Sequence, residues 1–234
     1  MTHTHDTAEQ IRAEYKRRAQ EIPADAYALH HPANLFIYQG QTRALLWALK
    51  SAGLLPLTER RILEVGSGRG NWLATLEAFE AKRERLAGID LDEERTAFCA
   101  RRFPGADIRV GDAAKLPWSD GEFDIVLQST VFTSILDAGM KQVVAREMLR
   151  VLKPQGAILW YDFHLNNPRN PHVRGVGRTE IQSLFPGCRV TLRRVTLAPP
   201  LARRLVPVSW IMCELLEKLR LLNTHYFGVL RRYE

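Results

Sequence analysis

Two patterns of hydrophobic and polar positions alternate along the chain. Short apolar runs recur, and the segments between them carry apolar residues at the spacing of one helical turn. The short runs are typical of buried strands, and the wider spacing is typical of amphipathic helices. Strands are expected over residues 61–65, 86–90, 106–112, 123–129, 157–163, 189–197 and 224–232. Helices are expected over residues 8–20, 35–52, 71–79, 93–103, 138–152, 178–185 and 201–222, with a loop at 153–156.

This order of elements predicts an α/β fold. Strands alternate with helices through most of the chain, and that alternation predicts a mainly parallel sheet with helices on both faces. The chain has 234 residues, which is enough for one domain with a full hydrophobic core. No linker divides the sequence, so a single domain is expected.

Composition narrows the class of protein further. Hydrophobic residues make up 46% of the chain, and no apolar stretch has the length of a membrane span. The N-terminal segment lacks the apolar core of a signal peptide. The three cysteines, at 99, 188 and 213, are far apart and form neither a metal-binding pattern nor a disulfide pattern. These features favour a cytoplasmic protein, and no metal site is expected.

The formal net charge of +7 leaves several partners open. Nucleic acid, anionic substrates and an acidic membrane surface all attract a basic protein. The arginines and lysines occur in short clusters rather than in one long block. A solvated basic surface is therefore the favoured interpretation.

A glycine-rich segment follows the first expected strand. The sequence ILEVGSGRG spans residues 62–70 and places glycine at 66, 68 and 70. Glycine allows a ligand to approach the backbone closely and tolerates positive φ, although a plain turn between strand and helix would also use it. Asp90 and Asp112 end the next two expected strands. Because ligands of open parallel sheets bind at the carboxyl ends of strands, these acids and the glycines predict a cofactor site.

The spacing of the glycines helps to identify the cofactor. A nicotinamide fingerprint reads G-x-G-x-x-G, whereas this segment reads G-x-G-x-G. Glu64 stands two residues before the first glycine, where its charge would oppose a pyrophosphate and suit a ligand with ammonium and sulfonium groups. No Gly-Lys-Ser/Thr follows, which excludes a phosphate-binding P-loop.

At this point the sequence resembles the class I, Rossmann-like S-adenosylmethionine-dependent methyltransferases. The family's first motif is similar to ILEVGSGRG, the second to LAGIDLDEE, the third to VGDAAKLPW and the fourth to FDIVLQSTVF. A further motif of the family is similar to EMLRVLKPQGAILWYDF. Five motifs in the family's order are much more specific than a glycine loop alone.

The resemblance implies a three-layer αβα sandwich. Its seven-stranded, mostly parallel sheet would have the order 3-2-1-4-5-7-6, with the last strand antiparallel. The resemblance also implies S-adenosyl-L-methionine as the cofactor. The expected domain, residues 1–234, would then comprise an N-terminal helical cap (1–58), a cofactor-binding core (59–165) and a substrate loop with C-terminal strands (166–234).

The resemblance assigns residues to the methionine end of the cofactor. Gly66, Ser67 and Gly68 would line the methionine part. Glu64 would organise that loop and its bound water or ammonium, and Gln128 would meet the amino-acid end. All five positions match the family's motifs.

The resemblance also assigns residues to the adenosine end. Asp90 would hold the ribose hydroxyls, and Leu91 would pack on the adenine. Asp112 would accept a hydrogen bond from the adenine amino group, with the Ala113 backbone beside it. The three glycines would then serve to make room for the cofactor.

Candidate catalytic residues follow the fifth expected strand. A weak nucleophile such as a hydroxyl needs a base, and His164 or Asp162 is the candidate, with Tyr161 beside them. Arg169 or Arg174 would bind an anionic group. A polar surface loop stiffened by proline is the alternative interpretation of this segment.

A second group of candidates precedes the first expected strand. In the family, segments at this place often cap the cofactor, so His30, His31 and Tyr38 would face the methyl group. Ordinary helix-start and packing roles are the alternative. We retain His31 as a candidate catalytic residue.

Several functions remain open. A small-molecule methyltransferase acting on a polar or anionic metabolite is favoured. The alternatives are a nucleic-acid methyltransferase, against which the sequence QSTV after the fourth strand argues, and an inactive cofactor-binding partner protein. Residues 201–222 are apolar with basic ends, so they would pack on the sheet, cover the site or rest on a membrane surface. The oligomeric state and the acceptor atom are left open.

Overall fold

The structure, a computed structural model, describes residues 17, 23, 25–166, 170 and 172–233. The helix expected over residues 8–20 lies outside these residues except for Arg17, and Arg169 lies outside them as well.

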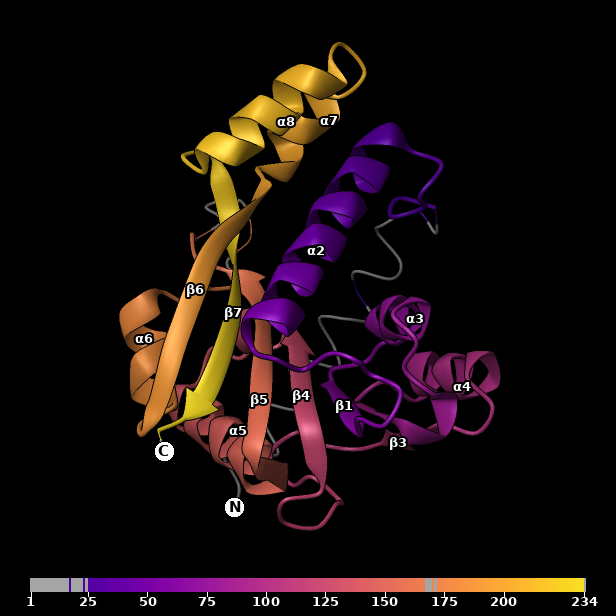
Figure 1. The fold of residues 1–234 in the computed structure, drawn as a ribbon. Coiled ribbons are helices and arrows are strands. Elements are labelled where there is room, and N and C mark those ends of the chain that lie inside the picture. The colour runs from indigo at the N-terminus through magenta and orange to yellow at the C-terminus, as the bar shows by residue number, and fades with distance from the viewer. Residues whose placement is uncertain (1–16, 18–22, 24, 167–169, 171, 234) are drawn as a thin grey trace.

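A seven-stranded sheet forms the centre of the molecule, in the order β3-β2-β1-β4-β5-β7-β6 (Figure 1). Strands β1 to β5 pair in parallel, and β7 runs antiparallel to both β5 and β6. The expected strand order and the antiparallel last strand are both confirmed. The strands are β1 (Ile62–Val65), β2 (Leu86–Asp90), β3 (Asp107–Val110), β4 (Phe123–Ser129), β5 (Leu152–Phe163), β6 (Cys188–Leu197) and β7 (Asn223–Arg232).

Helices cover both faces of this sheet and complete three layers. One hydrophobic core joins the sheet to α5 and α6, and a second joins its other face to α2, α3 and α4. The helices are α2 (Pro32–Ser51), α3 (Asn71–Ala78), α4 (Glu93–Arg102), α5 (Ala138–Val151), α6 (Arg178–Leu184), α7 (Pro199–Leu205) and α8 (Trp210–Leu219). Short 3₁₀ helices lie at Arg83–Arg85 (η1) and Phe132–Ser134 (η2).

Side-chain caps fix where two of these helices begin. The Asp92 carboxylate accepts a hydrogen bond from the Arg95 N–H (2.9 Å) at the start of α4, and Asp137 does the same for Met140 (2.6 Å) at α5. Such caps satisfy backbone donors that lack a partner within the helix. Helix α4 therefore begins three residues after the end of β2, whereas α5 begins after the loop that contains η2.

The fifth strand and the last helical region differ from expectation. Strand β5 begins at Leu152, so residues 153–156 are part of it rather than a loop, and its pairing with β4 shifts between Phe123 and Ile125. The helix expected over 201–222 is two helices, α7 and α8. Pro207 explains the break, because proline has no N–H to donate and its ring disfavours a continuing helix.

Helices α7 and α8, residues 199–222, form a hairpin between β6 and β7. Strand β6 runs parallel to β1, β4 and β5. The hairpin therefore leaves the sheet on the side where the carboxyl ends of those strands lie. Figure 1 shows it extending from that end of the sheet beside the N-terminal end of α2. The hairpin thus lies at the same end of the molecule as the glycine loop.

Candidate functional site

The glycine loop after β1 is held against β2 by its backbone. The N–H groups of Gly66 and Ser67 both donate to the carbonyl of Ile89, at 2.8 and 3.0 Å. Gly66 has φ +72°, and a Cβ built on it would lie 2.5 Å from Cγ2 of Val131. Only glycine therefore fits this position without displacing its neighbour. Ser67 is buried, with its side chain beneath the loop against Gly88.

Asp90 joins the glycine loop to the start of the loop after β2. Its Oδ2 accepts a hydrogen bond from the N–H of Gly68 (2.8 Å), and its Oδ1 accepts one from the N–H of Asp92 (2.9 Å). Burial raises the pKa of this carboxyl, and the two backbone hydrogen bonds oppose that rise. Both carboxylate oxygens keep lone pairs with which to accept hydroxyl groups.

A cleft opens beside this carboxylate. Gly66, Asp90, Leu91, Asp112 and Ala113 line it, which brings together five of the residues expected to hold a cofactor. Its remaining lining includes the apolar side chains of Ile89, Val131, Ile135, Met140 and Val144. An apolar slot with carboxylates at its edge suits a flat aromatic base joined to a hydroxylated sugar.

Glu64 and Gln128 each have a buried polar atom without a partner in the described structure. Glu64 is 2% exposed, and its Oε2 has no hydrogen-bond partner in the described structure. Gln128 is fully buried; its Oε1 accepts from the Val131 N–H (3.2 Å), while its Nε2 has no partner there. Buried polar atoms usually carry hydrogen bonds, so these two fit a site that a polar ligand completes.

The burial of Glu64 affects the protonation of its carboxyl group. Burial raises its pKa well above the usual value, although a hydrogen bond from the backbone of Leu73 opposes the rise. Burial therefore favours the neutral form of this carboxyl, and a cationic group bound beside it would favour the charged form.

Tyr161 and Asp162 lie on opposite faces of the sheet, because successive side chains of a strand alternate. The Tyr161 hydroxyl accepts from Gln41 Nε2 (2.9 Å) and shares a hydrogen bond with Thr196 Oγ1 (2.9 Å). Burial raises the pKa of this hydroxyl. The structure thus surrounds the Tyr161 hydroxyl with protein partners.

Asp162 is fully buried on the other face and is engaged by the loop after β4. Its Oδ1 accepts from Thr133 Oγ1 (2.7 Å) and from the Phe163 N–H (2.9 Å), and its Oδ2 accepts from the Thr133 N–H (3.2 Å). Burial raises the pKa of Asp162 to about 7 despite these hydrogen bonds. The geometry indicates that Asp162 positions the loop containing η2.

His164 is the more accessible of the candidates on this segment. It directly follows β5, and its Nε2 lies 2.9 Å from the carbonyl oxygen of Asn223. Because a carbonyl only accepts, Nε2 carries the hydrogen, and Nδ1 of the neutral ring is left as an acceptor. Burial lowers the pKa of His164, and the ring stacks on Tyr226 with centroids 4.4 Å apart. A neutral imidazole is therefore favoured.

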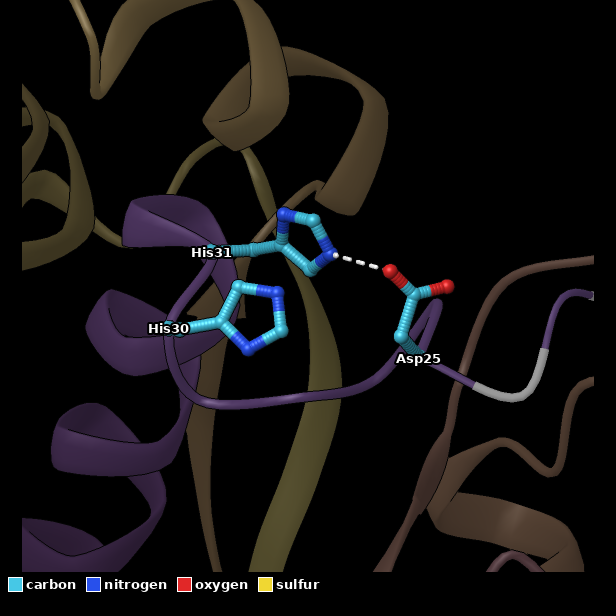
Figure 2. Close-up of side chains that lie close together, drawn as sticks. All are labelled: Asp25, His30 and His31. Atoms are coloured by element: carbon cyan, nitrogen blue, oxygen red, sulfur yellow. Dashed lines mark ion pairs between the residues drawn. The ribbon is translucent and has the colours of Figure 1, made fainter.

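His31 is exposed and lies just before α2. Figure 2 shows it beside His30, with its Nε2 3.5 Å from the Asp25 carboxylate. Asp25, His30 and His31 each have an atom that could bind a metal ion, and these three atoms lie within 4.8 Å of one another. His31 is not among the residues that line the cleft. Tyr38 lies further along α2, where its hydroxyl accepts from Thr75 Oγ1 (3.4 Å).

His225 in β7 is a further buried residue beside Tyr161, and it was not among the predicted site residues. Its ring stacks on Tyr161 (centroids 4.7 Å apart) and contacts Phe163 (3.8 Å). Burial lowers its pKa to about 3. The alternation of side chains within β7 would have predicted a buried side chain at position 225. Its aromatic partners lie in β5, and the sequence does not reveal the register between β5 and β7.

The sheet order and the cleft at the ends of β1, β2 and β3 define the class I, Rossmann-like methyltransferase fold. Residues 63–160 match the family model described as a methyltransferase domain. This part of the chain is therefore similar to methyltransferase domains, in agreement with the resemblance of its motifs to the S-adenosylmethionine-dependent class. The cofactor of that class is S-adenosyl-L-methionine.

Curated relatives match about half of the chain. A probable S-adenosylmethionine-dependent methyltransferase of Mycolicibacterium smegmatis is 35% identical over 134 residues, covering 54% of this chain and 50% of the relative. A phthiotriol/phenolphthiotriol dimycocerosates methyltransferase of Mycobacterium ulcerans is 33% identical over 50% of this chain and 43% of its own. A fatty-acid O-methyltransferase of M. smegmatis is 37% identical over 44% of this chain and 37% of its own. The chain thus matches half or less of each relative's length.

A solved structure supports the fold. A methyltransferase from Aquifex aeolicus, described as dependent on S-adenosylmethionine, superimposes with a TM-score of 0.55. The match covers 85% of this chain and 92% of that one at 19% sequence identity. At this identity the likeness concerns the fold alone.

Proposed function

We propose that the protein transfers a methyl group from S-adenosyl-L-methionine to an acceptor held at the carboxyl edge of the sheet. One observation carries the proposal: Asp90 fixes the Gly68 backbone at 2.8 Å beside a cleft lined by Leu91, Asp112 and Ala113. The bound cofactor supplies an electrophilic methyl group on a sulfonium. The protein's own task is to align a nucleophile with that methyl group and to exclude water.

The cofactor-binding roles remain those that the resemblance implies. Asp90 accepts the ribose hydroxyls, Leu91 packs on the adenine, and Asp112 accepts from the adenine amino group beside the Ala113 backbone. The lining of the cleft supports these roles. At the other end, the loop of Gly66, Ser67 and Gly68 lies against the methionine part.

The unpartnered atoms Glu64 Oε2 and Gln128 Nε2 support a polar group at that methionine end. A carboxyl oxygen and an amide N–H together suit an amino acid, which offers both an ammonium and a carboxylate. An ammonium near Glu64 would oppose the burial that raises its pKa and would favour the ionised carboxylate.

His164 is the proposed general base where the nucleophile is a hydroxyl. Its Nε2–H is held by the Asn223 carbonyl at 2.9 Å, which orients the ring and leaves Nδ1 to accept a proton. Tyr161 and Asp162 act as positioning residues instead, because both side chains are buried among protein partners. His31, just before α2, is the second candidate.

An apolar acceptor is favoured. Large hydrophobic side chains are exposed just after η2 and just after β5, at Leu136 (50%) and Leu165 (51%), and along the α7–α8 hairpin. These segments lie at the edge of the sheet that carries the cofactor cleft. A curated relative is named as a fatty-acid O-methyltransferase, which supports an acceptor with a long apolar part.

The small polar or anionic metabolite expected from the sequence remains the second candidate acceptor. The Arg174 N–H donates to the Thr133 carbonyl (2.9 Å), so the segment after β5 lies against the loop after β4 and could present its polar groups to a substrate. The nucleic-acid methyltransferase and the inactive cofactor-binding protein are the remaining alternatives.

We further propose that residues 1–58 cap the cofactor-binding core (59–165) in one domain and that the protein works in the cytoplasm. Cys99, Cys188 and Cys213 are free thiols, which suits a reducing compartment. No helix of the described residues is long and apolar enough to cross a membrane.

Two measurements test the proposed function. Calorimetric titration with S-adenosylhomocysteine measures cofactor binding without an acceptor. Transfer of label from methyl-labelled cofactor is then compared between long-chain fatty acids or phenolic lipids and sugars or sugar phosphates. Faster transfer to the lipids supports the apolar acceptor, and faster transfer to the sugars supports the polar one. If the protein binds the cofactor but transfers no label to any of these acceptors or to RNA, the result supports the alternative of an inactive cofactor-binding protein.

A further inference from the structure

The α7–α8 hairpin, residues 199–222, carries an unusual concentration of exposed hydrophobic side chains. Ile211, Leu215 and Leu219 of α8 are 74%, 58% and 63% exposed. They follow one another at intervals of four residues, so they form one stripe along the helix. Val208 before the helix and Leu221 after it are more than three-quarters exposed and extend the stripe at both ends. Exposed apolar patches of this kind mark interaction surfaces.

The opposite face of α8 is attached to α2. Arg43 of α2 donates to Glu217 (2.9 Å) and pairs with Glu214 (3.1 Å). Cys213 is buried on the same side, and Trp210 packs edge-on against Phe36 with ring centroids 5.3 Å apart. These contacts fix the orientation of the helix, so the apolar stripe is held pointing away from the rest of the protein.

The exposed charges of the hairpin are all basic. Its two acids, Glu214 and Glu217, are both paired with Arg43. Its four bases are exposed at the ends of the two helices: Arg203, Arg204, Lys218 and Arg220. Apolar side chains bordered by lysine and arginine are typical of helices that lie in the headgroup region of a membrane.

The position of the hairpin relates this surface to the site. It joins the carboxyl end of β6 to β7 and thus lies at the edge of the sheet that carries the glycine loop (Figure 1). Leu136 and Leu165, also half exposed, follow η2 and β5 at this same edge. An apolar acceptor leaving a membrane would reach the cleft from this side.

We propose that the α7–α8 hairpin docks the protein on an anionic lipid bilayer, with Ile211, Leu215 and Leu219 in the headgroup region. This inference deepens the proposed function, since it supplies an apolar acceptor from the membrane. A second copy of the chain fits this face less well. Across a two-fold axis the same basic side chains would face each other, and like charges at an interface oppose association.

Vesicle flotation tests the docking surface with the full chain. Wild-type protein is expected to bind vesicles of phosphatidylcholine mixed with phosphatidylglycerol more tightly than vesicles of phosphatidylcholine alone, and added salt is expected to weaken binding. Substituting Ile211→Gln, Leu215→Gln and Leu219→Gln together is expected to reduce partitioning by about 100-fold or more, since three large apolar side chains are removed. Glutamine preserves helix propensity, so the fold is retained.

The charge contribution is tested separately. The double variant Arg203→Gln/Arg204→Gln is expected to lose about fivefold per arginine on anionic vesicles and little on neutral ones. The matched controls are Tyr233→Gln, which changes an exposed aromatic residue past the end of β7, and Arg101→Gln/Arg189→Gln, which changes two exposed arginines away from the hairpin. Both controls are expected to bind vesicles as the wild type does.

Three results would overturn the docking proposal: no preference of the wild type for anionic vesicles, unchanged binding by the triple glutamine variant, or conversion of a wild-type dimer to a monomer by that variant in sedimentation analysis. Calorimetry with S-adenosylhomocysteine on the same preparations separates this failure from failure of the proposed function. If the protein does not bind vesicles but binds the cofactor, only the docking proposal is overturned. If it does not bind the cofactor but binds vesicles, only the methyltransferase proposal is overturned.

Discussion

Asp162 of β5 accepts two hydrogen bonds from Thr133, one from the hydroxyl at 2.7 Å and one from the backbone N–H at 3.2 Å. This pair joins the end of the fifth strand to the loop after the fourth, next to the residues that line the cleft. Both partners are buried, so the hydrogen bonds form away from water. The relationship links the protonation of one side chain to the position of a loop at the site.

Stability should therefore depend on pH through Asp162. Its folded-state pKa is raised from 3.8 to about 7, so its contribution is fully present below pH 4 and is lost as pH rises through 7. Between pH 5 and about pH 8, the free energy of unfolding of the wild type should therefore fall relative to that of Asp162→Asn. Urea unfolding of both proteins measures this; parallel pH profiles would contradict the prediction.

His225 should produce the opposite dependence in acid. Burial lowers its folded-state pKa from 6.5 to about 3, so its contribution is present above pH 6.5 and is lost as pH falls toward 3. The wild type should lose up to about 1.4 kcal/mol per pH unit in this range through this group. His225→Phe should lack that loss while retaining the ring contacts with Tyr161 and Phe163. Thermal unfolding of both proteins at pH 4, 5 and 6.5 tests the difference.

Removing the Asp90 carboxylate should weaken cofactor binding. Asp90→Ala removes the acceptor of two hydrogen bonds, which the backbone N–H groups of Gly68 and Asp92 donate, as well as the proposed acceptor for the ribose. Hydrogen bonds to a charged group contribute about 1.5–3 kcal/mol, so the Kd for S-adenosylhomocysteine should rise by at least about tenfold. Asp92→Ala removes the cap of α4 and serves as a control for lost stability. Equal Kd values for the two variants would contradict the role of Asp90.

Two glycines of the same loop should respond differently to alanine. Both have positive φ, +72° at Gly66 and +50° at Gly68, so each substitution should cost about 1–2 kcal/mol of stability. Gly66→Ala should cost more, because its Cβ would lie 2.5 Å from Val131, whereas no atom lies within 4 Å at Gly68. Adding Val131→Ala should recover part of the loss at Gly66 and none at Gly68. A double-mutant cycle by chemical denaturation measures this coupling.

His164→Gln should slow methyl transfer to a hydroxyl acceptor by about 10²–10⁴-fold, the usual contribution of a general base. Cofactor affinity should be unchanged, because the proposed role of His164 lies with the acceptor. His31→Gln is the matched comparison, since His31 is exposed and contacts Asp25 rather than the cleft. A large loss of rate in His31→Gln with none in His164→Gln would reverse the assignment.

Local sequence determined the succession of strands and helices along the chain and the place of the cofactor cleft, and the resemblance of the motifs implied the order of the strands in the sheet. Apolar runs, helical spacing and the glycines act over a few residues, and the motifs placed Asp90 and Asp112 at strand ends that a parallel sheet brings to one edge. Sequence spacing alone did not reveal the extension of β5 to Leu152, because that extension depends on pairing with β4. The break between α7 and α8 was not predicted either, although Pro207 is a local signal for it.

Only the tertiary structure decided which candidate side chains are accessible. Tyr161, Asp162 and His164 are close neighbours in sequence, yet their hydrogen-bond partners are Gln41, Thr133 and Asn223 from three other segments of the chain. The burial of each side chain, and hence the direction of its pKa, follows from strand register and from contacts between residues far apart in sequence. Periodicity specifies which face of an element is apolar, but it does not specify what that face meets.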